Sequence, residues 1–181
     1  MRVTVCELPH ETDALAAAWA DLAEHTLVHA SQLVLLPEFA MVDPVWESRP
    51  FDIARWNAVE ALSAMQLRRL PELRAEFVVG TRPVRVKGRC VNQGYVWSAA
   101  TGLRRLRSKY FLPEEPGSWE ATWFHRGDPV FPVYYAGPLS FGLNICTELW
   151  ALETYADYAA PAASHRAVVA AVRSGAFKNG R

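Results

Sequence analysis

The sequence has no excess of charge of either sign. It carries 19 basic and 19 acidic side chains, so its formal net charge is zero. Proteins that bind nucleic acid or an anionic membrane over a broad surface normally carry excess positive charge. The balance removes that long-range attraction, so we expect no nucleic-acid or membrane partner and favour a small neutral molecule as the substrate. The closely spaced basic residues between Arg82 and Lys109 are then best interpreted as the solvent face of a strand pair.

Long hydrophobic runs are also missing. No segment approaches the roughly 20 apolar residues that cross a bilayer, and the N-terminal sequence MRVTVCELPHETD has no apolar stretch of signal-peptide length. We therefore expect a cytoplasmic protein without a membrane partner. Because 51% of the 181 residues are hydrophobic, the chain can bury one core, and we expect residues 1–181 to form a single domain.

Cysteine is scarce. The chain has Cys6, Cys90 and Cys146, an odd and widely spaced set that fits neither a disulfide framework nor a CxxC metal knuckle. We expect free thiols, one of which could be reactive. Glycine-rich phosphate loops are absent, and the i, i+4 pair His25 and His29 has no third ligand nearby. No metal or other cofactor is predicted.

The first half of the chain predicts a β-α-β unit followed by a helix. An apolar, β-branched run indicates the first strand, and a continuous apolar run that stops at a proline indicates the second, covered on both faces. Thr12 or Asp13 could cap the helix between them. The predicted elements are a strand from Arg2 to Leu8, a helix to about Ala30, a strand from Leu33 to Leu36 and a helix from about Asp52 to Leu70.

The second half predicts further strands and one irregular loop. Turn residues at Gly88 and at Thr101-Gly102 separate β-rich segments, which indicates antiparallel neighbours and hence a mixed sheet of an α/β fold. Pro113 to Pro138 is too irregular for a regular element and too apolar for a disordered linker, so we expect an ordered surface loop near a pocket. The strands run from Phe77 to Gly80, Val91 to Ala99, Leu103 to Lys109 and Ser140 to Ile145, and a helix follows from Thr147 to about Ala160.

Three residues that could perform chemistry follow strands. Glu38, Lys109 and Cys146 each stand at a strand end, and the strands of one sheet can bring such ends together. A cysteine beside a carboxylate and an ammonium has what amide hydrolysis requires, because a thiolate is the nucleophile, a carboxylate can take its proton and a cation can stabilise an oxyanion. Taken singly, each has a simpler interpretation as a core cysteine, a helix-end carboxylate or a solvated charge.

The sequence motifs around these residues resemble those of a known family. LVLLPEF around Glu38, LRSKYFLPEE around Lys109 and FGLNICTELWALE around Cys146 resemble, in the same order, the base, lysine and nucleophile motifs of the nitrilase or carbon-nitrogen hydrolase superfamily. The resemblance implies hydrolysis of an amide, carbamoyl compound or nitrile through a thioester on Cys146. It implies Glu38 as the base, Lys109 as the oxyanion partner, and no cofactor.

The resemblance implies further site residues. A second glutamate that orients the lysine and the substrate matches Glu120, with Glu114 and Glu115 as competitors. Substrate-binding roles fall to Trp119, Trp123, Thr147 and Glu148, although core packing explains any one of the aromatic residues as well.

The resemblance implies a four-layer α-β-β-α sandwich, in which two sheets stack back to back across a dimer axis. The implied assembly is a homodimer formed through the helix after the nucleophile. Tyr155 and Tyr158 are the candidate interface residues. Residues 161–181 depart from the family pattern and are shortened relative to it, so we expect a fold that is incomplete on its C-terminal side.

Two functions remain open. The first is a carbon-nitrogen hydrolase, with amidase favoured over nitrilase, and the second is an inactive, truncated relative that binds a ligand or partner. A Cys-His hydrolase would need His125, and no motif around it supports that role.

Overall fold

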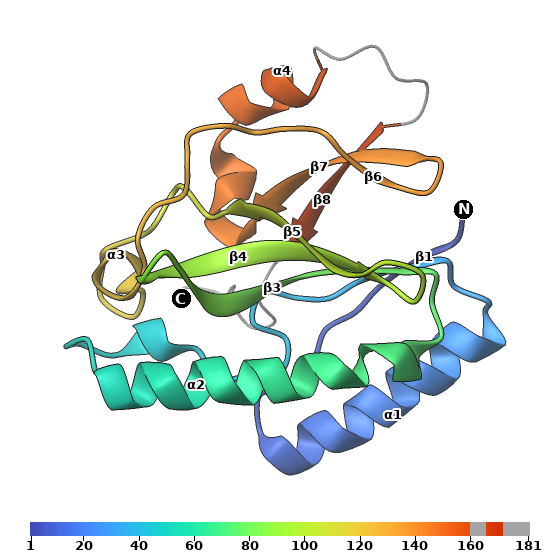
Figure 1. The fold of residues 1–181 in the computed structure, drawn as a ribbon, viewed down its shortest axis with the longest axis horizontal. Coiled ribbons are helices and arrows are strands. Elements are labelled where there is room, and N and C mark those ends of the chain that lie inside the picture. Colours follow the sequence, from blue (N-terminus) through green and yellow to red (C-terminus); the bar gives the residue numbers. More distant parts are fainter. Residues whose placement is uncertain (160–165, 172–181) are drawn as a thin grey trace, which may run out of the picture.

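The computed structural model describes residues 1–159 and 166–171. Figure 1 shows two sheets with helices on their outer faces. The α-helices are α1 (Thr12–Val28), α2 (Ile53–Gln66), α3 (Glu120–Trp123) and α4 (Glu153–Ala159), and the 3₁₀ helices are η1 (Val45–Glu47), η2 (Leu67–Leu73) and η3 (Cys146–Trp150). The strands are β1 (Val3–Val5), β2 (Leu33–Leu35), β3 (Phe77–Val86), β4 (Arg89–Ser98), β5 (Gly102–Ser108), β6 (Tyr134–Ala136), β7 (Leu139–Ile145) and β8 (Arg166–Ala171).

The larger sheet has five strands in the order β1-β2-β3-β4-β5. β1, β2 and β3 are parallel, whereas β3, β4 and β5 are antiparallel to their neighbours, which confirms the predicted mixed sheet. The smaller sheet has the order β6-β7-β8, with β6 antiparallel and β8 parallel to β7. The carboxyl ends of β2 and β7, where Glu38 and Cys146 follow, therefore belong to different sheets.

Successive side chains of β2 point to opposite faces of the sheet, and both faces are buried. Val34 packs in the core that α1 and η2 form against the larger sheet, whereas Leu33 and Leu35 pack against the smaller sheet. Phe141 and Leu143 of β7 face them in this second core. Each face of the strand thus contributes to a separate hydrophobic layer.

The stacking of the two sheets takes place within one chain. α1 and α2 lie on the outer face of the larger sheet and α4 lies on the outer side of the smaller one (Figure 1), where the Tyr158 hydroxyl donates a hydrogen bond to the Leu143 carbonyl at 2.8 Å. The expectation that the sheets would need a dimer axis in order to stack is therefore wrong. Gly94 of β4 permits the close approach, because a Cβ there would come within 2.3 Å of Leu143 Cδ2.

Several local predictions need correction. Thr12 and Asp13 already belong to α1, so neither of them is its N-cap residue. The N-cap residue is Glu11, which makes no side-chain capping bond. α2 ends at Gln66 and continues as the 3₁₀ helix η2, which includes Pro71 rather than stopping before it. The interruption arises because a proline cannot donate the i→i−4 bond that an α-helix requires.

The segment after the nucleophile candidate is not a single helix. η3 ends at Trp150, and α4 starts only at Glu153. The predicted loop from residue 113 to residue 138 is more regular than expected, since it contains α3 and β6. An aromatic core holds this region, with Phe39, Trp46, Trp56, Trp123 and Phe124 packed together.

No helix among the described residues is both long and apolar enough to cross a membrane. The predicted dimer interface at Tyr158 lies inside the chain, because Tyr158 is 4% exposed and packs on β7. Of the residues predicted to be atypical, 161–165 and 172–181 lie outside the described part of the chain.

Candidate active site

Three of the four predicted catalytic residues are joined by hydrogen bonds. The Lys109 ammonium donates to Glu38 Oε1 at 3.0 Å and to Glu120 Oε1 at 2.8 Å. Glu38 comes shortly after β2, Lys109 directly follows β5, and Glu120 is the first residue of α3. The competitors lie elsewhere: Glu114 pairs with Arg49, and the side chain of Glu115 is exposed.

These three side chains are withdrawn from solvent. Lys109 is 0% exposed, Glu38 1% and Glu120 2%. Burial acts to lower the pKa of Lys109, but the carboxylates of Glu38 and Glu120, followed by Cys146, outweigh it and raise that pKa. The Cys146 thiol thus interacts electrostatically with the ammonium.

One ammonium faces two carboxylates, which leaves an uncompensated negative charge in a dry environment. Burial, and then the Glu38 carboxylate, raise the pKa of Glu120 to about 8, against the opposing effect of Lys109. A proton on Glu120 therefore relieves the charge imbalance near neutral pH.

Asn92 of β4 is a site residue that the sequence did not reveal. Its side-chain amide donates to Glu38 Oε1 at 2.7 Å, and it is 1% exposed. Glu38 Oε1 thus accepts from both Asn92 and Lys109, whereas Oε2 is buried without a hydrogen-bond partner among the described residues. Oε2 is the oxygen positioned to receive a proton. An asparagine in a strand of apolar neighbours was the available signal, because Asn is depleted in strands.

Cys146 stands where β7 turns sharply into η3. Its φ is 50°, a left-handed conformation that non-glycine residues adopt at a cost of roughly 1–3 kcal/mol. Phe39, the residue after Glu38, has a φ of 52°. Such strain concentrates at functional sites. Cys146 is half-buried, so a small molecule can reach it.

Glu148, which the sequence placed among the substrate-binding residues, lies inside the protein. It is 0% exposed and forms an ion pair with Arg107, whose Nη2 lies 2.9 Å from Glu148 Oε1. Its carboxylate also accepts the backbone N–H groups of Tyr110, at 2.7 Å, and Ile145, at 2.9 Å. It therefore ties the residue after Lys109 to the residue before Cys146.

Arg107 corrects another expectation. The basic residues of β5 were predicted to face solvent, which holds for Arg104 and Arg105 but not for Arg107, which is 8% exposed. The register between β4 and β5 shifts there, since Tyr95 pairs with Arg105 and Gln93 with Ser108. The extra residue in β5 interrupts the alternation and turns Arg107 inward.

The other predicted substrate-binding residues surround the site in different ways. Trp123 is 1% exposed and its Nε1 donates to the Ser48 carbonyl at 2.7 Å, so it packs in the aromatic core. Trp119 is half-buried, with the Arg49 guanidinium 4.0 Å from its ring centroid. The Thr147 hydroxyl lies 3.4 Å from the Phe111 carbonyl.

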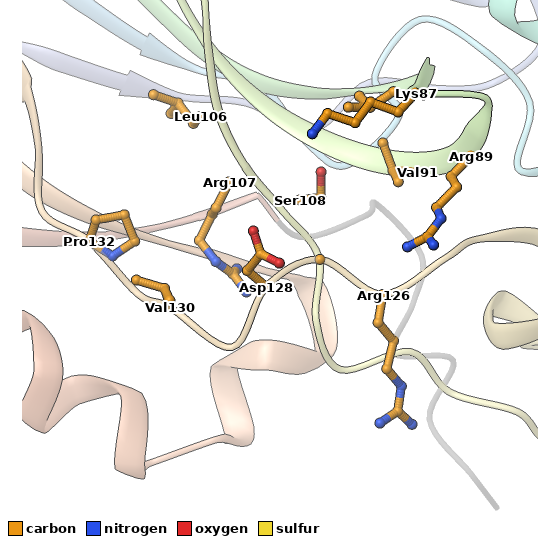
Figure 2. A pocket seen from close by; sticks show the side chains of 12 residues that line it. Lys87, Arg89, Val91, Leu106, Arg107, Ser108, Arg126, Asp128, Val130 and Pro132 are labelled. Atoms are coloured by element: carbon orange, nitrogen blue, oxygen red, sulfur yellow. The ribbon is translucent and has the colours of Figure 1, made fainter.

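A pocket of about 640 Å³ is lined in part by Arg107 and Ser108 (Figure 2), and none of the predicted catalytic or substrate-binding residues lines it. In the described part of the chain, no three His, Cys, Asp or Glu side chains are grouped so that they could hold a metal ion. The rings of His25 and His29 lie 4.3 Å apart on α1.

Comparison with known proteins adds the family context. The family profile described as "Carbon-nitrogen hydrolase" matches residues 2–172. Among curated proteins, none matches the chain significantly. A carbon-nitrogen hydrolase from Helicobacter pylori G27 superposes with a TM-score of 0.78 at 18% identity, covering 94% of this chain and 60% of that one.

Two further solved structures are similar. A double mutant of the amidase from Nesterenkonia sp. AN1, in complex with acrylamide, gives a TM-score of 0.70 at 16% identity over 94% of this chain and 64% of that one. A glutamine-dependent NAD⁺ synthetase from Acinetobacter baumannii gives 0.71 at 18% identity over 91% of this chain and 31% of that one. The chain thus spans less than two thirds of the length of each.

Proposed function

Because the chain belongs to the carbon-nitrogen hydrolase family, we propose that it hydrolyses a non-peptide carbon-nitrogen bond in a small amide, carbamoyl compound or nitrile. The observation that supports this proposal most strongly is the burial of Lys109 between Glu38 and Glu120. Three buried ionisable groups are costly to hold in a protein interior, and such groups are concentrated at functional sites.

In the first step, Glu38 Oε2 takes the proton of the Cys146 thiol while the sulfur attacks the carbon of the amide or nitrile. Oε2 suits this role because it is the oxygen of Glu38 that has no partner among the described residues. The negative charge that develops on the substrate oxygen, or on the nitrile nitrogen, is stabilised by the Lys109 ammonium and by the backbone N–H that follows Cys146.

In the second step, the carbon-nitrogen bond of an amide breaks, the nitrogen leaves as ammonia or an amine with the proton that Glu38 received, and a thioester remains on Cys146. A nitrile first gives a thioimidate on Cys146, to which one water adds, and the loss of ammonia then leaves the same thioester. Glu38 then accepts a proton from water, which attacks the thioester and returns the thiol together with the acid. No cofactor takes part in this scheme.

The remaining residues have positioning roles in the proposal. Glu120 orients Lys109 through its hydrogen bond, and Asn92 orients Glu38. Glu148 holds the backbone on either side of the site, which suits it better to positioning than to substrate contact. Trp119 and Thr147 are the predicted substrate contacts that are not fully buried, and Trp123 supports the wall behind them.

An amide is the preferred substrate class within this proposal. The similar Nesterenkonia amidase has been solved with acrylamide bound, and acrylamide is a small primary amide. The assembly proposed alongside is a homodimer, for which Trp150 and Leu152, 72% and 73% exposed, offer apolar surface next to α4.

The alternative is a binding protein without activity, and one observation favours it. Val3 and Val5 of β1 pair with Leu33 and Leu35 of β2 and so share their face of the sheet. Leu33 and Leu35 are buried against the smaller sheet, whereas Val3 and Val5 are 51% and 71% exposed. The apolar layer between the sheets is thus uncovered at β1.

Ammonia release from a panel of small primary amides, carbamoyl compounds and nitriles tests the proposal. The expected result is release from at least one amide, abolished in Cys146→Ala and retained in the matched control Cys90→Ala, since Cys90 belongs to the aromatic core. Release that persists in Cys146→Ala would rule out Cys146 as the nucleophile, and a complete absence of turnover with a folded protein would favour the binding role.

A further inference from the structure

A pocket outside the catalytic residues has the size of a small-molecule site. It holds about 640 Å³, within the roughly 300–1,000 Å³ typical of ligand pockets. Its walls come from the tip of the β3–β4 hairpin, from β5, and from the loop that follows α3 (Figure 2).

The charge of this pocket is predominantly positive. Lys87, Arg89 and Arg126 line its rim, and all three side chains are exposed. No carboxylate of the described residues forms an ion pair with any of them. Asp128 is the acid among the lining residues, so the rim carries three positive charges against one negative charge.

The floor of the pocket adds a buried donor. Arg107 lines the pocket, and its side chain is 4% exposed. Its two terminal nitrogens contact Glu148, but its Nε is buried without a hydrogen-bond partner among the described residues. An unsatisfied buried donor costs roughly 1–3 kcal/mol, and an oxyanion in the pocket would satisfy it. Ser108 offers a hydroxyl beside it.

The rest of the lining is apolar. Val91 and Leu106 face the pocket from the strands, and Val130 faces it from the loop. A free inorganic ion would leave these side chains uncovered. The combination of a positive rim, a buried donor and apolar walls suits a molecule with one anionic end and a hydrophobic body.

We propose that this pocket binds a small organic molecule through an oxyanion group, a phosphate or a carboxylate, which the positive rim attracts and the Nε–H of Arg107 holds. The bound group lies next to the Arg107–Glu148 ion pair, and Glu148 holds the backbone N–H of Ile145, the residue before Cys146. The proposal does not depend on hydrolysis, because binding is measured without turnover.

Titration calorimetry at low ionic strength, with phenyl phosphate, inorganic phosphate and benzoate as probes, tests it. Phenyl phosphate is expected to bind more tightly than inorganic phosphate because its ring covers the apolar walls. Benzoate distinguishes the source of the oxyanion, since binding of benzoate but not of phenyl phosphate would assign a carboxylate ligand.

A matched pair of double variants gives the control. Arg89→Gln/Arg126→Gln is expected to weaken phenyl phosphate binding about tenfold, whereas Arg104→Gln/Arg105→Gln, which removes two exposed arginines outside the pocket, should leave it unchanged. Equal weakening by both variants would mean that overall charge attracts the probe, and the absence of binding by phenyl phosphate and benzoate alike would overturn the proposal.

Discussion

The Lys109 side chain is 0% exposed, so its charge must be compensated inside the protein. Glu38 and Glu120 provide that compensation, and Asn92 completes the group by holding Glu38. Separate motifs around Glu38 and Lys109 indicated those two residues, and the family's second glutamate indicated Glu120. Asn92 was not predictable in the same way, because its role depends on the register that brings β4 beside the end of β5, where the Lys109 N–H donates to the Asn92 carbonyl at 2.8 Å.

The raised pKa of Glu120 predicts a pH-dependent stability. Its folded-state pKa is about 8 against an ordinary value of 4.5, so the folded protein holds the proton more tightly. This contribution to the free energy of unfolding is complete below about pH 4.5 and is lost as the pH rises through about 8. Glu120→Gln should therefore lose less stability than the native chain between these limits, measured by urea unfolding at several pH values. The exposed Glu115→Gln is the control, and parallel curves for all three proteins would refute the assignment.

Breaking the Arg107–Glu148 ion pair should be severe. Arg107→Met leaves Glu148 buried without its cation, which costs about 3–5 kcal/mol in the free energy of unfolding. Arg85→Met breaks the ion pair with Glu60 on the surface and should have a much smaller effect. Urea denaturation of the two variants measures the difference. Equal losses would show that the buried pair contributes no more to the free energy of unfolding than the surface pair does.

Among the elements, the helix starts show how side chains decide where regular structure begins. The Asp52 carboxylate accepts the backbone N–H groups of Ala54, at 2.8 Å, and Arg55, at 3.2 Å, at the start of α2. Asp52 was recognisable near the start of its predicted helix. Glu11 was not recognisable as the residue before α1, because its side chain makes no capping bond and its residue type therefore gives no signal.

Truncating the capping side chain of α2 should lower the free energy of unfolding, whereas truncating the side chain that precedes α1 should not. Asp52→Ala is expected to lower the free energy of unfolding by about 1 kcal/mol, because two backbone donors lose their acceptor. Glu11→Ala is the matched control and should leave thermal and urea unfolding nearly unchanged. A loss of similar size in both variants would contradict the capping role of Asp52.

Other element boundaries depend on tertiary context. β3 extends to Val86, well beyond the predicted end at Gly80, because β4 pairs with it along its whole length. The segment Arg82 to Val86 mixes arginines with a proline, and only that pairing identifies it as a strand. The inward turn of Arg107 likewise follows from a register shift that no periodicity in β5 encodes.

At the scale of the molecule, the two sheets enclose one apolar layer. The apolar runs of β2 and β7 made strands with two buried faces predictable, and the motif order made the family predictable. That the sheets stack within one chain could not be deduced, since strand patterns do not say which faces meet. The homodimer and the roles of the site residues stay predictions.

The layer between the sheets should dominate stability. Leu143 is 0% exposed within it, so Leu143→Ala is expected to lower the free energy of unfolding by about 2–5 kcal/mol. Val5→Ala, at a position 71% exposed on β1, should change it little. Urea unfolding compares the two, and similar small losses would mean that the sheets are not packed against each other in solution.

The proposed hydrolysis requires an assembled nucleophile at Cys146. Burial raises the pKa of Cys6 to about 12 and also raises that of Cys90, so both should react slowly with an alkylating agent. Brief treatment with limiting iodoacetamide, followed by intact-mass spectrometry and peptide mapping, compares the three thiols. The prediction is selective labelling of Cys146 that falls away in Lys109→Met. Equal or negligible labelling of all three cysteines in a folded protein would contradict it.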